Sequence, residues 1–110
     1  MSYKLSITPA FEKDAKPLLK KYRSLKNDLA ALFESLEKEP DQGKQLGRDC
    51  YKIRLAITSK GKGKSGGARV ITCVKVLAEN IFLLSIYDKS EKEDISDKEL
   101  KELLKKTELL

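Results

Sequence analysis

The sequence of 110 residues predicts a single α+β domain with the element order β-α-α-β-β-β-α. The length matches the usual size of one domain. Apolar residues recur at helical spacing near both ends of the chain, whereas alternating and β-branched segments occupy its middle. We therefore expect residues 1–110 to form one domain, with a mostly antiparallel sheet and a hairpin of two helices packed on one face.

The chain is expected to begin with a short strand followed by a helix. Residues 3–8 alternate between apolar and polar side chains, which predicts a strand with one buried face. Thr8 is suited to cap a helix and Pro9 to occupy its first position. Apolar residues then follow at helical spacing up to residue 22, but Pro17 lies among them, so we expect a kink there or two short helices.

A second amphipathic helix is predicted for residues 25–36, where leucine and phenylalanine recur at helical spacing. It should end before Pro40, and the short link at Ser24 predicts that the two helices are antiparallel. Residues 41–49 contain two glycines and are expected to form a loop.

Three consecutive strands are predicted in the second half of the chain. Residues 50–57 alternate, residues 68–77 are rich in valine and isoleucine, and residues 81–86 are nearly all apolar, as in a central strand. Their short connections favour antiparallel neighbours. The connection at 59–67 holds four of the six glycines and three lysines, which predicts a flexible basic loop. A capping box at 96–99 predicts a short last helix, and the second face of the sheet is expected to stay partly open.

Composition excludes several functional classes. The chain has no histidine, so it lacks the usual general base, the commonest zinc ligand and every histidine-based catalytic pair. Its two cysteines have no C-x-x-C spacing and are expected to be small buried residues in a reducing compartment. No segment has the length of a signal peptide or membrane span, so we expect a cytoplasmic protein without a membrane partner. No motif typical of a metal or cofactor site is present, so we expect neither a metal nor a cofactor.

Positive charge is concentrated in the middle of the chain. The net charge is +6, but residues 50–78 contain seven basic and no acidic residues, so the remainder of the chain sums to 6 − 7 = −1. Such a concentration indicates a polyanionic partner such as nucleic acid, or an acidic protein. The alternative interpretation is that these basic residues form an ordinary solvated surface without a specific partner. The acidic residues at 88–94 are explained by the favourable effect of negative charge at a helix N-terminus.

The period of two along a strand predicts which basic side chains share a face. Aligning the three strands brings five side chains to one face, namely Lys52, Arg54, Arg69, Tyr87 and Lys89. On the last strand, this face is expected to include Ile81, Leu83 and Ser85 as well. Arginines in such a cluster could bind a phosphate through paired hydrogen bonds. Further lysines are predicted to contact a nucleic-acid backbone: Lys60, Lys62, Lys64 and Lys75.

Three stretches resemble the RelE/ParE superfamily of small toxins from bacterial toxin–antitoxin pairs, on its RelE/HigB side. They are residues 50–55 (CYKIRL), 60–71 (KGKGKSGGARVI) and 83–91 (LLSIYDKSE), and the order of predicted elements also matches. The resemblance implies a RelE-like fold and a ribosome-dependent endoribonuclease that cleaves mRNA in the A site. In that reaction the ribose 2′-OH attacks the adjacent phosphate and leaves a 2′,3′-cyclic phosphate and a 5′-OH end.

The resemblance also assigns roles. Lys52 and Arg54 match basic residues on the first strand after the helices, Arg69 matches an arginine at the start of the next strand, and Tyr87 and Lys89 match the functional end of the last strand. A lysine crowded by cations loses its proton more easily, so Lys52 could be the base, and Tyr87 could be an acid or stack on a nucleobase. Which group holds which proton stays open. The basic loop at 59–67 is longer than in the shortest family members. This difference leaves the placement of Arg69 open, and it suggests extra contacts to ribosomal RNA.

Two other functions remain open from the sequence. A ParE-type toxin would inhibit DNA gyrase by binding it, without nuclease activity, and a plain RNA-binding module would cut nothing. The basic face with Arg69 and Tyr87 favours the nuclease. The expected partners are a cognate antitoxin, the ribosome and mRNA, with no small-molecule cofactor. An antitoxin segment would cover the open sheet face or the last helix.

Overall fold

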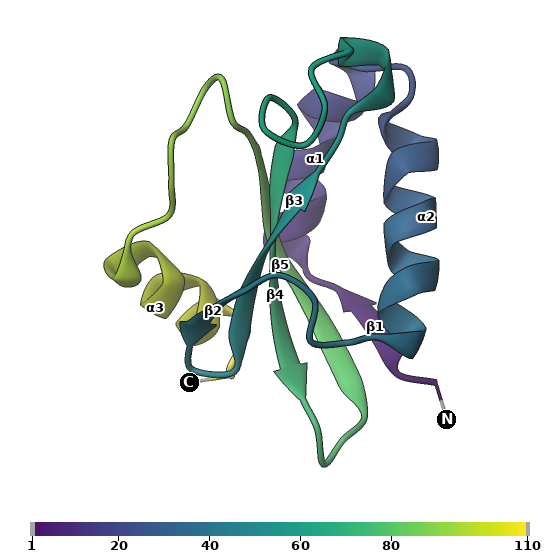
Figure 1. The fold of residues 1–110 in the computed structure, drawn as a ribbon. Coiled ribbons are helices and arrows are strands. Elements are labelled where there is room, and N and C mark those ends of the chain that lie inside the picture. The colour runs from purple at the N-terminus through teal and green to yellow at the C-terminus, as the bar shows by residue number, and fades with distance from the viewer. Residues whose placement is uncertain (1, 110) are drawn as a thin grey trace.

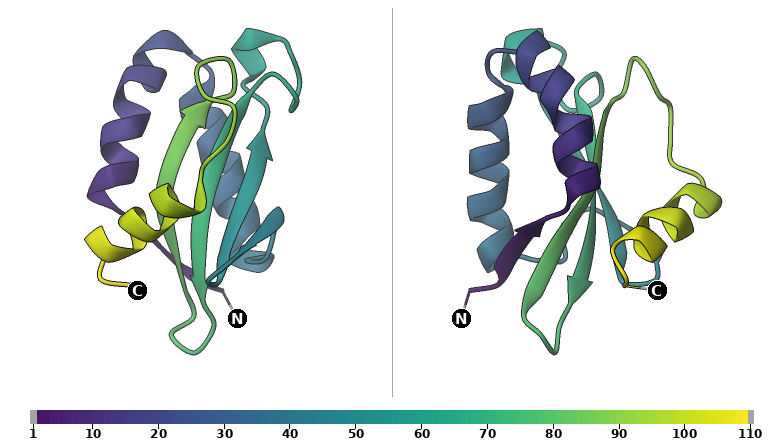
Figure 2. Two further views of the ribbon diagram at one scale, coloured as in Figure 1. Left: turned by 90° about the vertical axis from the view of Figure 1, so that its left-hand side faces the viewer. Right: turned by 180° about the vertical axis from the view of Figure 1, so that it is seen from behind.

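A five-stranded sheet separates a pair of helices from a third helix in the computed structural model, which describes residues 2–109 (Figure 1). In chain order the elements are β1 (Lys4–Ile7), α1 (Pro9–Lys21), α2 (Leu25–Lys38), β2 (Lys44–Gly47), β3 (Cys50–Leu55), the 3₁₀ turn η1 (Thr58–Lys60), β4 (Ala68–Lys75), β5 (Asn80–Asp88) and α3 (Asp97–Lys106). Figure 2 shows α1 and α2 on one face of the sheet and α3 on the other. None of the helices in residues 2–109 is long and apolar enough to span a membrane.

The strand order across the sheet is β1-β5-β4-β3-β2. The three consecutive strands β3, β4 and β5 are antiparallel neighbours, as their short connections predicted. β1 pairs in parallel with β5, where Lys4 lies opposite Asn80. The predicted α+β class and mostly antiparallel sheet are therefore confirmed, with one strand more than expected.

The helix pair begins at the predicted cap. The Thr8 hydroxyl accepts a hydrogen bond from the Phe11 amide at 3.2 Å and donates one to the Leu83 carbonyl at 2.7 Å, which fixes the start of α1 on the sheet. The rings of Phe11, near the start of α1, and Phe33, near the end of α2, lie 6.3 Å apart. The two helices are therefore antiparallel, as predicted.

α1 is one helix and not two short ones, although it contains a proline. Pro17 is exposed, and the buried residues Phe11, Ala15 and Leu18 lie on both sides of it in the sequence. Packing of this continuous apolar face holds both halves of the helix on the core and offsets the lost backbone hydrogen bond.

The expectation of a loop over residues 41–49 was wrong, because this segment contains β2. Its sequence, KQLG, has one apolar residue and no alternation. The strand forms by pairing with the first half of β3, where Lys44 lies opposite Lys52. The two strands form a hairpin, since only Arg48 and Asp49 separate them and both have a positive φ. β2 therefore depends on pairing with β3 and not on an apolar pattern of its own.

A β-bulge in the β4–β5 ladder corrects the predicted faces of the last strand. Ile71 pairs with Ser85 but Thr72 pairs with Leu83, so one extra residue of β5, Leu84, lies between them. An extra residue shifts the alternation by one position. Tyr87 therefore lies on the α3 face, whereas Ile81, Leu83 and Ser85 face the helix pair; Ser85 donates a hydrogen bond to Asp14 of α1 at 2.7 Å.

α3 packs on the second face of the sheet, which we expected to stay partly open. Its buried residues Leu100 and Leu104 join a second, smaller core with residues of β3, β4 and β5: Cys50, Ile71, Cys73, Leu84 and Tyr87. The predicted capping box is confirmed, since Ser96 and Glu99 exchange side-chain and backbone hydrogen bonds. The face is covered next to α3 and remains accessible toward Arg54.

Gly43, just before β2, is expected to be intolerant of a side chain. Its φ is +97°, and an added Cβ would overlap the carbonyl oxygen of Lys52. Gly43→Ala should lower the free energy of unfolding by about 2 kcal/mol or more, measured by urea denaturation. Gly61→Ala is the matched control, because Gly61 has a φ of +72° with no atom within 4 Å of the added Cβ; it should cost only about 1 kcal/mol. Equal losses for the two variants would contradict a steric role for Gly43.

Candidate phosphate-binding site

Three of the predicted site residues form a row across the sheet. Arg54 of β3 lies opposite Arg69 of β4, and Arg69 lies opposite Tyr87 of β5. Side chains opposite each other on one face are about 5 Å apart. Lys52 lies two residues from Arg54 on β3 and therefore on the same face. The structure thus brings Lys52, Arg54, Arg69 and Tyr87 together on the face of the sheet that also carries α3.

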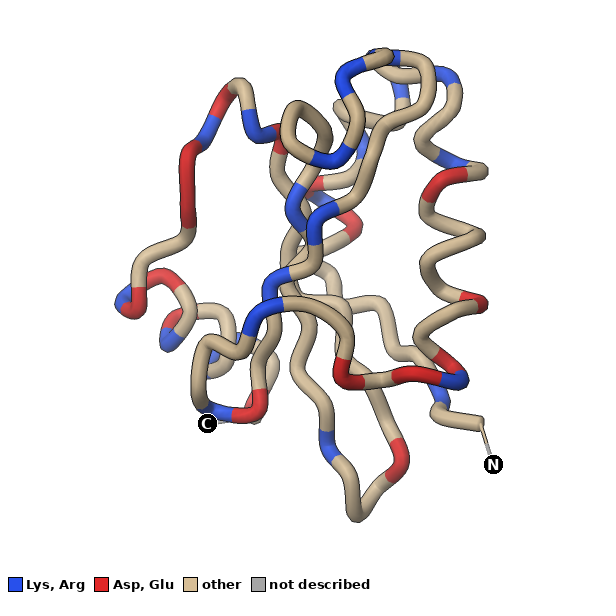
Figure 3. Tube along the Cα trace, viewed as in Figure 1, with Lys and Arg blue, Asp and Glu red and all other residues tan. Residues whose placement is uncertain are grey.

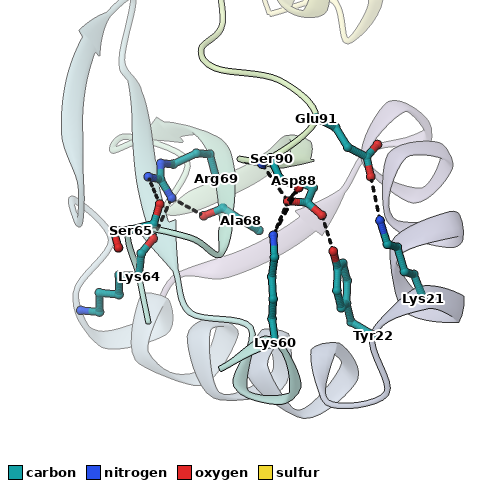
Figure 4. Close-up of polar contacts among 10 residues, drawn as sticks. All are labelled: Lys21, Tyr22, Lys60, Lys64, Ser65, Ala68, Arg69, Asp88, Ser90 and Glu91. Carbon is teal, nitrogen blue, oxygen red and sulfur yellow. Dashed lines mark hydrogen bonds and ion pairs between the residues drawn. The ribbon is translucent and has the colours of Figure 1, made fainter. Parts of the chain in front are cut away.

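Arg69 is buried and binds the basic loop between η1 and β4 (Figure 4). Its guanidinium donates hydrogen bonds to the carbonyl oxygens of Lys64 at 2.9 Å, Ala68 at 3.1 Å and Ser65 at 3.4 Å. The guanidinium therefore fixes the C-terminal half of the loop while it contributes positive charge to the row. Arg54, in contrast, is exposed.

An acidic segment lies against this basic face. We call residues 89–96, between β5 and α3, the β5–α3 connection; Figure 3 shows its acidic stretch. Asp94 binds the Lys52 ammonium at 2.9 Å, and Glu93 binds that of Lys89 at 3.2 Å. The hydrogen bond from Lys52 holds the pKa of Asp94 below its ordinary value, so this carboxylate is charged at neutral pH.

Tyr87 supplies a buried phenol beside the two arginines. Its side chain is 7% exposed, and its hydroxyl has no hydrogen-bond partner within residues 2–109. The Lys92 ammonium lies 5.3 Å from the centre of its ring. Burial, together with the negative charge of Asp94, raises the pKa of Tyr87 to about 12, although the positive charge of Arg69 acts to lower it. The phenol is therefore protonated at neutral pH and has a hydrogen bond to donate.

A groove of about 1070 Å³ runs along this part of the molecule. It is bordered by β2, β3, α2, the basic loop and the β5–α3 connection. Its charged lining comprises Asp28, Lys44, Lys52, Arg54, Lys64, Arg69, Lys89, Glu93 and Asp94. Cations outnumber carboxylates in it, so an anionic ligand is favoured. Within residues 2–109 no three cysteine, aspartate or glutamate side chains are grouped as metal ligands.

Asp88 organises the base of the basic loop, a role that no pattern in the sequence indicates. Its fully buried carboxylate accepts hydrogen bonds from Lys60 at 2.8 Å, from Tyr22 at 2.5 Å, and from the amide and hydroxyl of Ser90 at 2.9 and 2.7 Å (Figure 4). Burial would raise the pKa of Asp88, but these hydrogen bonds outweigh it and hold the pKa well below its ordinary value. The network joins α1, η1 and the end of β5.

The four lysines predicted to contact a nucleic acid fall into three different environments. The Lys60 ammonium is nearly buried against Asp88, so it is occupied in this structure. Lys62 and Lys64 are exposed on the basic loop, and Lys64 borders the groove. Lys75 lies at the opposite end of β4, about 20 Å from Arg69 along the strand, where it binds Asp49. The structure therefore does not bring Lys60 and Lys75 together with the basic row.

Comparison with known proteins identifies a family and a solved structure that the chain resembles. The family model described as RelE toxin of the RelE/RelB toxin–antitoxin system matches residues 11–110. The solved structure of an E. coli RelE toxin, a double arginine-to-alanine mutant in the free state, has a TM-score of 0.63 and 21% sequence identity. That match covers 96% of this chain and 98% of the E. coli chain. At this identity the structural likeness concerns the fold.

Proposed function

The chain belongs to the RelE toxin family of RelE/RelB toxin–antitoxin systems, and from this premise we propose that it is a ribosome-dependent endoribonuclease that cleaves mRNA. Family membership makes it a toxin with a RelB-type antitoxin as its partner. The ribosome and the mRNA are the partners that the proposed activity adds.

The observation that carries the proposal is the row of Arg54, Arg69 and Tyr87 beside the groove. The two guanidinium groups line the groove, where a single phosphodiester could contact both. The unpartnered phenol lies on the strand next to Arg69 and is buried, so RNA must open access to its hydroxyl. Cleavage of RNA builds negative charge on the phosphate, and donors fixed in advance around such a charge are the largest usual source of catalysis. The buried, hydrogen-bonded position of Arg69 supports this role, because it holds the guanidinium in place.

In the proposed reaction these side chains act on an mRNA that the ribosome holds in place. The ribose 2′-oxygen forms a bond to phosphorus while the bond from phosphorus to the 5′-oxygen breaks, which yields a 2′,3′-cyclic phosphate and a 5′-OH. Arg54 and Arg69 stabilise the phosphate oxygens. Tyr87, which is protonated at neutral pH, is the proposed donor to the leaving 5′-oxygen. Lys52 is the proposed acceptor of the 2′-OH proton, a role that it can fill only as the neutral amine, after it has left Asp94 and lost its own proton.

Purified protein is expected to cut mRNA only when the mRNA is bound to ribosomes. The assay incubates an mRNA with the toxin in the presence or absence of ribosomes and maps the new ends by primer extension. We expect 5′-OH ends and 2′,3′-cyclic phosphates with ribosomes and intact RNA without them. A parallel DNA supercoiling assay with gyrase is the control for the other activity in the superfamily. If the mRNA stays intact and gyrase is inhibited, the nuclease proposal is rejected in favour of a gyrase inhibitor.

A further inference from the structure

The β5–α3 connection places carboxylates where the proposed function needs phosphates. Asp94 and Glu93 both line the groove that holds Lys52, Arg54 and Arg69. A carboxylate and a phosphate present the same kind of acceptor to a lysine, namely a charged oxygen at hydrogen-bond distance. The acidic connection therefore fits the basic face in the way that an RNA backbone would.

The contact between Asp94 and Lys52 is the centre of this arrangement. One carboxylate oxygen of Asp94 lies 2.9 Å from the Lys52 ammonium and also accepts a hydrogen bond from the Ile95 amide at 2.8 Å. The side chain of Lys52 is 16% exposed, whereas that of Asp94 is 60% exposed. The lysine is thus part of the sheet surface, and the aspartate lies over it from the solvent side.

We propose that Asp94 occupies a phosphate subsite at Lys52 in the free protein, so that an RNA phosphate must displace it to bind. The inference rests on the proposed function, because it specifies how that site is filled before RNA arrives. Asp94 acts here as an internal competitor and not as a catalytic residue.

The anchoring of the connection explains how Asp94 can leave without unfolding the domain. At one end the amide of Lys89 is bound to Gly67 at 3.0 Å, and at the other the capping box at Ser96 and Glu99 starts α3. Ser90, Glu91 and Lys92 are bound to Asp88 by hydrogen bonds. The segment that carries the two groove carboxylates is held by the surface ion pairs of Glu93 with Lys89 and of Asp94 with Lys52. Such exposed pairs are weak individually, so displacement of Asp94 should reduce RNA affinity only about two- to fivefold.

Asp94→Asn tests the proposal directly. Asparagine removes the charge and keeps an oxygen that can accept the Ile95 hydrogen bond. Affinity is measured by fluorescence anisotropy with a labelled single-stranded RNA of about ten nucleotides, without ribosomes and at low ionic strength. We expect the variant to bind this RNA about two- to fivefold more tightly than the wild type.

Glu91→Gln is the matched control, because it makes the same change of net charge in the same connection. Glu91 binds Lys21 on α1 and does not line the groove. It should bind RNA like the wild type. Equal tightening by both variants would mean that only net charge matters, and unchanged binding by Asp94→Asn would mean that the subsite is not blocked; each result overturns the proposal. Urea denaturation verifies that both variants fold like the wild type.

The experiment also separates this proposal from the proposed function. Tighter binding by Asp94→Asn, with no cleavage of ribosome-bound mRNA by any variant, would keep the phosphate subsite and reject the nuclease. Cleavage by the wild type, with no gain in RNA affinity on removal of the Asp94 charge, would keep the nuclease and reject the internal competitor.

Discussion

Replacing Arg69 with alanine is expected to reduce ribosome-dependent mRNA cleavage at least about 100-fold, the usual cost of removing one fixed donor from a charge-stabilising site. The variant should also lose about 2 kcal/mol of stability, because three carbonyl oxygens of the chain lose a charged hydrogen-bond donor. Single-turnover cleavage and urea denaturation measure the two effects separately.

Two control variants distinguish catalysis from loop anchoring. Arg54→Ala removes the same charge from the same row but from an exposed position, so cleavage should fall by a similar factor while stability stays within about 0.5 kcal/mol. Lys75→Ala removes a cation at the opposite end of β4 and should leave cleavage near the wild-type rate. If Arg69→Ala and Arg54→Ala both cleave normally, the row of cations is not the active site.

Asp88→Asn is expected to destabilise the protein by about 3–5 kcal/mol, a larger loss than that expected for Arg69→Ala. The substitution removes the charge that compensates the nearly buried ammonium of Lys60, and an uncompensated buried charge is costly. The hydroxyl of Tyr22 and the Ser90 amide lose a charged acceptor at the same time. Urea denaturation at neutral pH measures the loss, and Asp49→Asn, which breaks the more exposed pair with Lys75, should cost less than about 1 kcal/mol.

The same carboxylate should make stability depend on pH in the acid range. The pKa of Asp88 is lower in the folded protein than its ordinary value near 3.9 in the unfolded chain. The unfolded state therefore takes up the proton first, so the contribution of Asp88 is fully present above about pH 4 and is lost as the pH falls toward the folded-state pKa. Asp88→Asn should show a weaker decline of stability between neutral pH and about pH 2 than the wild type; parallel declines would contradict this assignment.

Local patterns were sufficient to predict most elements of the fold. Thr8 and Ser96 begin helices as their side chains indicated. Alternation located β1 and β3, and the valine and isoleucine content located β4. The edge strand β2 was missed, because its sequence carries one apolar residue and the turn to β3 is formed by Arg48 and Asp49 at positive φ, without a glycine between the strands. The position of α3 on the second face likewise depends on a second core that only tertiary packing creates.

The candidate site was predicted in part. The alignment of Arg54 with Arg69 followed from simple strand pairing. Tyr87 reached the same face for another reason, since the bulge at Leu84 reversed the alternation that we had extended from Ile81. The roles of Lys60 and Asp88 could not be read from the sequence, because nothing local distinguishes a buried ion pair from two surface charges.

The parallel pairing of β1 with β5 has a consequence for how the protein is made. β5 lies between β1 and β4 in the sheet. However, β1 is the first strand to be synthesised and β5 is the last, followed only by α3. Contacts between such distant parts of a chain form late in folding, after a large loop has closed. A nascent chain that lacks β5 has no Tyr87. It also has no strand with which β1 and the exposed edge of β4 could pair. If ribosomes are its target, the toxin is thus inert toward the ribosome that is translating it until synthesis is almost complete.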